Sequence, residues 1–157
     1  MRGLPLRRER PLRLLGVVCR MDGSPERTIR GDRACRVATK LGTTNLTLEA
    51  GGWLLALHGE HDLTTVSALE HQMQHVRSAS TNVVIDLSDA AFIDCAIAGW
   101  LAHWAESAQN VGDLHLAVVV GPDGTIAHRV CDLLSIDRIV PCRDTRERAL
   151  RVVEGGL

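Results

Sequence analysis

The stretch NVVIDLSDAAFIDCAIAGWLAHW, residues 82–104, decides the fold. Its opening residues, 83–87, form a nearly continuous apolar run of the kind found in strands that are buried on both faces. From Cys95 onward, small and apolar residues would cover most of the surface of a helix that ends at Gly112, which predicts a deeply packed helix. A doubly buried strand followed by such a helix is typical of an α/β domain with a parallel sheet.

The residues before this stretch predict a hairpin and a helix. Residues 44–62, TNLTLEAGGWLLALHGEHD, read as two strands joined by a tight turn at Gly51 and Gly52. In residues 63–80 the apolar side chains recur at helical spacing. This pattern predicts an amphipathic helix that is capped by Thr64 or Thr65.

The residues after this stretch continue the alternation of strands and helices. Residues 114–121 predict another buried strand, and residues 125–136 predict a helix. Residues 137–142 predict a short strand at the edge of the sheet, because Pro141 has no backbone N–H to donate. Residues 144–156 predict a closing helix. The resulting order, β-β-α-β-α-β-α-β-α, favours a largely parallel sheet with right-handed crossovers.

Charge divides the 157-residue chain into two parts. Residues 1–40 hold eleven Lys and Arg against four Asp and Glu, which leaves seven basic and fifteen acidic residues in 41–157. We therefore expect a basic, disordered extension over residues 1–41 and one acidic domain over residues 42–154. An acidic domain argues against nucleic acid as a direct partner. No apolar run approaches the roughly 20 residues that span a bilayer, so we expect no membrane partner.

Motifs that would indicate catalysis or nucleotide binding are absent from the sequence. It contains no G-x-x-x-x-G-K-[ST], G-x-G-x-x-G or G-x-S-x-G. Cys95 with His58 or His61 could form a Cys–His pair, which leaves an enzyme as an alternative. His71 and His75 have the i, i+4 spacing that can bind zinc, but no third ligand is evident. We expect a protein that is not an enzyme and has no metal or cofactor.

Five cysteines, at positions 19, 35, 95, 131 and 142, show no C-x-x-C spacing. Without a secretory signal, this usage predicts the reduced cytoplasm. Cys131 and Cys142 could approach each other across a helix and the next strand. The sequence leaves open whether they form a disulfide or remain two small buried thiols.

Three blocks of sequence, taken together, resemble the STAS domain, the fold of bacterial anti-sigma factor antagonists. They are LLALHGEHDLTTVSALEHQM (54–73), NVVIDLSDAAFIDCAIAGWLAHW (82–104) and RVCDLLSIDRIVPCRDTRERAL (129–150). The first is similar to the family's opening strand and its G-E-x-D-L motif, and the second to its central strand and its D-S-S-G-L-type loop. The third is similar to its closing helix, strand and helix. The resemblance implies a small mixed, mostly parallel sheet with helices packed against it.

The resemblance also implies a function in transcription. Similar proteins bind an anti-sigma factor, usually an ATP-binding serine kinase, which inactivates them by phosphorylating a Ser or Thr directly after the loop aspartate. A phosphate there adds nearly two negative charges at the interface. In this sequence Asp94 matches the aspartate, but Cys95 takes the switch position and cannot be phosphorylated by a serine kinase. The implied partner-binding residues are Glu60, Asp62, Thr64, Asp94, Cys95, Ala96 and Ile97.

Cys95 itself leaves two interpretations open. It could fill a small buried space, so that the antagonist would have no switch. It could also be a redox switch, because a helix N-terminus lowers the pKa of a thiol while the neighbouring Asp94 raises it. A different role for the whole domain also stays open, namely that of a STAS subunit in a lipid-transport ATPase complex.

Overall fold

The computed structural model of the chain describes residues 30–31, 34–39, 41–79 and 82–155. The helices are α1 (Leu63–Ala79), α2 (Cys95–Val111), α3 (Ile126–Leu133), α4 (Arg146–Gly155) and the short 3-10 helix η1 (Ile136–Arg138). The strands are β1 (Arg30–Gly31), β2 (Ala34–Ala38), β3 (Gly42–Glu49), β4 (Gly52–His61), β5 (Asn82–Asp86), β6 (Ala90–Ile93), β7 (His115–Val119) and β8 (Cys142–Arg143).

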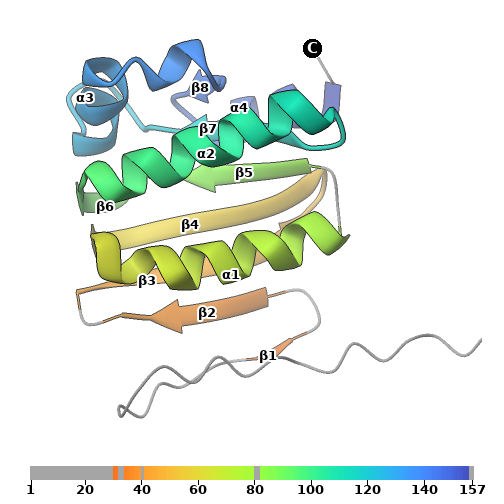
Figure 1. Cartoon of the computed structure of the whole chain (residues 1–157), viewed down its shortest axis with the longest axis horizontal. Coiled ribbons are helices and arrows are strands. Elements are labelled where there is room, and N and C mark those ends of the chain that lie inside the picture. The colour runs from red at the N-terminus through yellow and green to blue at the C-terminus, as the bar shows by residue number, and fades with distance from the viewer. Residues whose placement is uncertain (1–29, 32–33, 40, 80–81, 156–157) are drawn as a thin grey trace, which may run out of the picture.

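Across these described ranges, eight strands form one mixed sheet (Figure 1). Its order is β1-β2-β3-β4-β5-β7-β8, and β6 pairs with the last residues of β4. The pairs β1–β2, β2–β3 and β3–β4 are antiparallel. The pairs β4–β5, β4–β6, β5–β7 and β7–β8 are parallel. The predicted mixed α/β sheet with packed helices is therefore confirmed.

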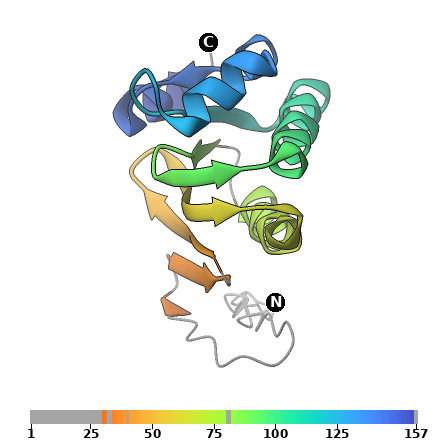
Figure 2. The ribbon, with the colours of Figure 1, turned by 90° about the vertical axis from the view of Figure 1, so that its left-hand side faces the viewer.

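Helices cover both faces of the central strands. The two long helices, α1 and α2, lie side by side on one face, as Figure 1 shows from the front. On the opposite face α4 packs against β4, β5 and β7, and the turned view of Figure 2 separates the two layers. The helix α3 lies beside β6, at one end of the sheet. Parallel strands need such two-sided cover because both of their faces are apolar.

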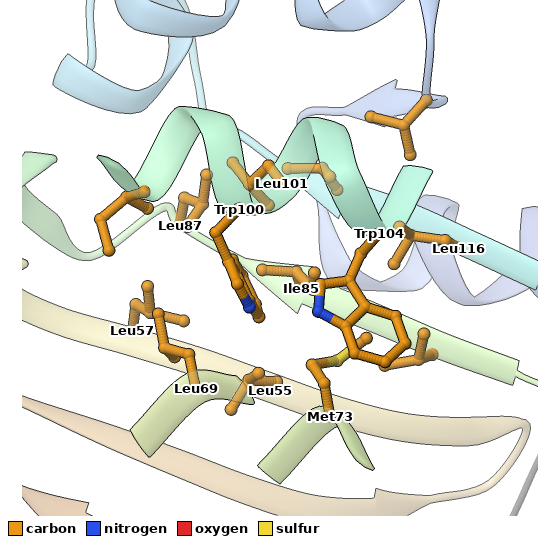
Figure 3. Packing of buried hydrophobic residues seen from close by; sticks show 14 of the residues in the cluster. Leu55, Leu57, Leu69, Met73, Ile85, Leu87, Trp100, Leu101, Trp104 and Leu116 are labelled. Carbon is orange, nitrogen blue, oxygen red and sulfur yellow. The ribbon is translucent and has the colours of Figure 1, made fainter. Parts of the chain in front are cut away.

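Alternation along β4 divides the core into two clusters. Leu55 and Leu57 face α1 and α2, and they belong to the larger cluster, part of which Figure 3 shows. Leu54 faces the other way and belongs to a smaller cluster with Ala149 and Val153 of α4. The period of two along a strand accounts for this division. All of these side chains are buried, which is why the sequence of β4 reads as an almost unbroken apolar run.

A shared carboxylate joins α1 to α2 within the larger cluster. The Oε2 atom of Glu70 accepts hydrogen bonds from the indole N–H groups of Trp104, at 2.9 Å, and Trp100, at 3.2 Å. Both indoles are buried, 2% and 5% exposed, so their N–H groups need a partner inside the protein. Gln74 donates to the other oxygen of Glu70 at 3.2 Å. The two helices are thus held by polar contacts as well as by apolar packing.

A buried aspartate at the end of β5 fastens α4 to the other face. Asp86 is 1% exposed, and its Oδ1 accepts from the backbone N–H of Ser88 at 2.9 Å and from the Ser88 hydroxyl at 2.7 Å. Its Oδ2 accepts from Nε of Arg146, in the first turn of α4. A buried carboxylate is tolerated because both of its oxygens are hydrogen-bonded and one is ion-paired.

The structure corrects three local expectations. Residues 30–31 and 34–38, which we predicted as part of a disordered extension, form β1 and β2, and β2 pairs with β3. Residues 1–29, 32–33 and 40 of that predicted extension lie outside the described residues. The expected strand over 137–142 is mostly the turn of η1, and only its end joins β8, which pairs with β7 through Cys142. The strand β6 was not predicted.

Candidate functional site

Asp94 directly follows β6 and is the N-cap residue of α2. Its Oδ1 accepts hydrogen bonds from the backbone N–H groups of Ala96, at 2.9 Å, and Ile97, at 3.1 Å. Its Oδ2 accepts from the N–H of Leu63, the first residue of α1, at 3.2 Å. A single carboxylate therefore satisfies N–H groups at the starts of two helices, which would otherwise lack partners.

Asp62 caps α1, so the prediction of a threonine cap is wrong, although two threonines complete the cap. The Oδ1 of Asp62 accepts from the backbone N–H of Thr64 at 2.9 Å and from its hydroxyl at 2.5 Å. The hydroxyl of Thr65 accepts from the backbone N–H of Asp62 at 3.4 Å, in the manner of a capping box. The hydrogen bonds from Thr64 hold the pKa of the Asp62 carboxyl below its usual value.

The ends of β4 and β6 bring these two helix starts together. In the parallel pair, Glu60 lies opposite Phe92. The backbone N–H of Asp94 donates to the carbonyl of His61 at 3.3 Å. We call the surface at this end of the sheet the β4–β6 rim. It consists of Glu60, Asp62, Leu63, Thr64, Phe92, Asp94 and Cys95.

Two of the residues expected at a docking surface are placed differently by the structure. Ile97 is fully buried in the larger core cluster, so the prediction that it contacts a partner is corrected. Ala96 is half-buried. The period of 3.6 residues explains the difference, because Cys95 opens α2 on its solvent side and Ile97, two residues on, points toward the sheet.

Two exposed apolar side chains on the rim were missed by the sequence analysis. Leu63 is 70% exposed and Phe92 is 48% exposed. Because Phe92 and Glu60 are paired in register, their side chains project from the same face of the sheet as neighbours. The sequence held one signal for Phe92. It is the single phenylalanine of the chain, and it stands directly before the helix-capping segment rather than in a predicted core strand.

Cys95 is exposed at the first position of α2, so the interpretation that it fills a buried space is wrong. The backbone N–H groups of Ala96 and Ile97, which follow it, are already hydrogen-bonded by Asp94. The thiol is therefore presented to solvent at a helix start whose first donors are occupied.

The two histidines proposed as catalytic partners of Cys95 make other contacts. His61 is fully buried, and its Nε2 lies 3.0 Å from the carbonyl oxygen of His58. Burial lowers the pKa of His61. The Nδ1 of His58 lies 3.4 Å from Oδ2 of Asp89. In the part of the chain that the structure describes, no hydrogen bond joins either histidine to Cys95, so the geometry of a Cys–His pair is not formed.

Other binding sites considered from the sequence do not coincide with the rim. His71 and His75 are exposed, and no set of three potential metal ligands gathers among the described residues. One cavity, of about 280 Å³, is lined by residues of α2 and α4, and a second, of about 190 Å³, lies beside α3. No rim residue lines either cavity. Among the described helices, none is both long and apolar enough to cross a bilayer.

Comparison with known proteins points to one family. A family model described as "Mlab, STAS domain" matches residues 45–140. The crystal structure of an anti-sigma factor antagonist from Mycobacterium paratuberculosis superposes with a TM-score of 0.60 at 27% identity, covering 74% of this chain and 97% of that chain. A search of curated proteins found no match.

Two further solved structures share the fold at lower identity. The NMR structure of the protein TM1081 gives a TM-score of 0.59 at 21% identity, covering 69% of this chain and 86% of that chain. The anti-sigma factor antagonist SpoIIAA in its unphosphorylated form gives a TM-score of 0.57 at 17% identity, covering 71% of this chain and 96% of that chain. At these identities the likeness concerns the fold alone.

Proposed function

The chain belongs to the STAS domain family, and we propose that it acts as an anti-sigma factor antagonist. In this proposal it is a cytoplasmic regulator without catalytic activity, which binds an anti-sigma factor of the ATP-binding serine-kinase type. Binding would free a sigma factor and so change transcription. The similarity to an anti-sigma factor antagonist over 97% of the length of that chain supports this reading.

The observation that carries the proposal is the combination of side chains exposed on the β4–β6 rim. Phe92 and Leu63 present apolar surface, and Glu60 and Asp62 surround it with negative charge. Exposed aromatic side chains bordered by polar residues are typical anchors of protein–protein interfaces. We expect the partner to offer an apolar pocket with basic residues around it, because complementary charge speeds association and fixes register.

Cys95 gives the proposed antagonist a distinctive property. A cysteine at the switch position cannot receive phosphate from a serine kinase, so a kinase-type partner would be unable to inactivate the protein there. Because the thiol is exposed on the same rim as Phe92 and Leu63, we expect chemistry at Cys95 to affect a partner that docks there. We therefore propose an antagonist that stays competent to bind irrespective of the kinase activity of its partner.

The test is a binding measurement with a pair of matched variants. Purified anti-sigma factors of the source organism are titrated with the wild-type chain, Phe92→Asp and Leu48→Asp, by isothermal calorimetry. Leu48 of β3 is the control because it is 43% exposed, close to the 48% of Phe92. It pairs with Trp53, which lies at the other end of β4 from Glu60. At about 3.3 Å per residue, the seven residues from Trp53 to Glu60 separate the two positions by roughly 23 Å.

We expect at least one anti-sigma factor to bind, and Phe92→Asp to weaken that binding about tenfold or more while Leu48→Asp leaves it unchanged. Equal losses in the two variants would mean that the rim is not the interface. If no anti-sigma factor binds and an ATPase subunit of a lipid transporter does, the alternative left open by the sequence replaces the proposal.

A further inference from the structure

Two cysteines outside the rim lie where α3, η1 and β8 come together. Cys131 lies on the buried side of α3 and is 2% exposed. Cys142 opens β8 and is half-buried. Both line the same cavity of about 190 Å³ beside α3. Their positions in the fold therefore bring two thiols from neighbouring elements to one small space.

Each thiol affects the ionisation of the other, and the Cys142 thiol also donates to the carbonyl oxygen of Val140 at 3.6 Å. The hydrogen bond from Cys131 lowers the pKa of the Cys142 thiol, and the Arg143 guanidinium acts in the same direction, against burial and the nearby Asp137 and Asp132, which raise it. The same hydrogen bond, together with burial, raises the pKa of Cys131. These opposite directions favour ionisation of Cys142 over that of Cys131, with Cys131 as the hydrogen-bond donor. Such an asymmetric pair is the arrangement of an attacking and a resolving cysteine.

The surroundings make Cys142 reachable from solvent. The cavity is also lined by Asp123 and His128, and the side chain of Asp123 is fully exposed. The Nε2 of His128 lies 3.3 Å from Oδ1 of Asp123, and its Nδ1 lies 3.1 Å from Oδ2 of Asp132. Cys131 belongs to the larger core cluster and Cys142 packs against it, so the pair lies between the apolar core and this polar wall.

We propose that Cys131 and Cys142 are a redox-active dithiol, which hydrogen peroxide or a similar small peroxide converts into an intramolecular disulfide between α3 and β8. This modification site is independent of the proposed partner and of Cys95. The sequence left open whether these two cysteines form a disulfide or remain buried thiols, and the proposal specifies the reaction that would form the disulfide.

The reaction balances in two steps. The thiolate of Cys142 attacks one peroxide oxygen, the O–O bond breaks, and after proton uptake the products are a sulfenic acid and one water. The sulfur of Cys131 then attacks the sulfenic sulfur and loses its proton, and the second water leaves as the S–S bond forms. Overall two thiols are oxidised by two electrons, and one peroxide is reduced to two waters.

The bond would fix the turn between α3 and β8. It closes a loop that contains η1, with Ile136 and Val140 packed into the larger core cluster. Closing a loop stabilises the folded state mainly by restricting the unfolded chain. For a loop and a domain of this size, we expect the melting temperature to rise by about 5–10 °C on oxidation.

The experiment uses the full chain, reduced and then treated with peroxide. Remaining thiols are alkylated under denaturing conditions, and peptides are mapped by mass spectrometry. We expect a Cys131–Cys142 cross-linked peptide in the wild type and in Cys95→Ser, and a melting temperature that rises on oxidation and returns with dithiothreitol. In Cys142→Ser and Cys131→Ala the cross-link and the rise in melting temperature should both disappear.

Two results would overturn the proposal, and both are read from the wild type, so they do not depend on how well the variants fold. One is that both cysteines remain fully alkylatable after peroxide treatment while Cys95 is oxidised. The other is a disulfide that joins either cysteine to a different partner, or that links two chains.

Discussion

Asp62 and Asp94 stand in equivalent places, each directly before a helix at the same end of the sheet, yet their carboxylates have different contacts. Among the described residues, the Asp62 carboxylate bonds only within its own turn, to the N–H and the hydroxyl of Thr64. Asp94 bonds the start of its own helix and also reaches 31 residues back along the chain, to the N–H of Leu63. The first carboxylate orders a turn, and the second joins two elements.

This difference separates the exposed surface of the rim from a frame that consists of one rim residue, Asp94, and the core residue Ile97. Asp94 and the buried Ile97 form the frame, because their contacts hold the two helix starts in place. Glu60, Leu63 and Phe92 form the surface, because their side chains remain available to a partner. Substitutions in the frame should therefore change stability first, whereas substitutions on the surface should change binding first.

The largest effect is expected at Ile97. Ile97→Glu removes a fully buried side chain and places a carboxyl group in an apolar core, which should cost about 4 kcal/mol or more of unfolding free energy. Urea denaturation followed by circular dichroism measures this loss, and Ile97→Val, with an expected cost of about 1 kcal/mol, is the control. If Ile97→Glu keeps wild-type stability and loses only partner binding, Ile97 belongs to the surface and the division fails.

A smaller loss of stability is expected at Asp94. Asp94→Ala leaves three backbone N–H groups without their acceptor and should cost about 2 kcal/mol. Asp94→Asn, which keeps an acceptor oxygen, should lose less than half as much in the same denaturation assay. Equal stability of Asp94→Ala and the wild type would show that the carboxylate does not hold the two helices.

The smallest effect is expected at Asp62, and it depends on pH. The hydrogen bonds from Thr64 lower the pKa of this carboxyl in the folded state, below the value of about 3.9 for an unfolded aspartate. Its contribution to stability is therefore present above about pH 4 and is lost as the pH falls through the lowered pKa. Asp62→Asn should make the unfolding free energy depend less on pH below about pH 4. The change should be small, since the group is exposed to solvent.

Denaturation between about pH 2 and 7 measures this curve. The exposed Asp113, which lies outside the rim, provides the matched control Asp113→Asn. If the two variants give the same curve, the bonds from Thr64 do not act on the ionisation of Asp62, and the contrast between the two aspartates rests on Asp94 alone.

The alternation of strands and helices could be predicted because its signals are long and local. The apolar run of β5 and the helical spacing of α1 each extend over enough residues to indicate one element type. β6 could not be predicted in this way, because it has four residues and the middle two are exposed. It exists as a strand because β4 continues past β5 and offers backbone partners.

The rim was predicted in outline and missed in detail for a similar reason. Glu60, Asp62, Asp94 and Cys95 do meet, which follows from the ends of two neighbouring strands. Whether a side chain next to them faces outward depends on tertiary packing, so Ile97 was taken as exposed and Phe92 was overlooked. The strand β2 was missed because it has only five residues, none of them fully buried, and lies in a strongly basic segment.

The carboxylate shared by Trp100 and Trp104 has an optical consequence. The chain contains no tyrosine and three tryptophans, so its ultraviolet emission comes from indoles alone, and all three are buried. Two of them are hydrogen-bonded by Glu70 across the contact between α1 and α2. Any event that separates these helices breaks those bonds and admits water, which shifts the emission to longer wavelength. The protein therefore carries an intrinsic, label-free reporter of how closely its two long helices are docked.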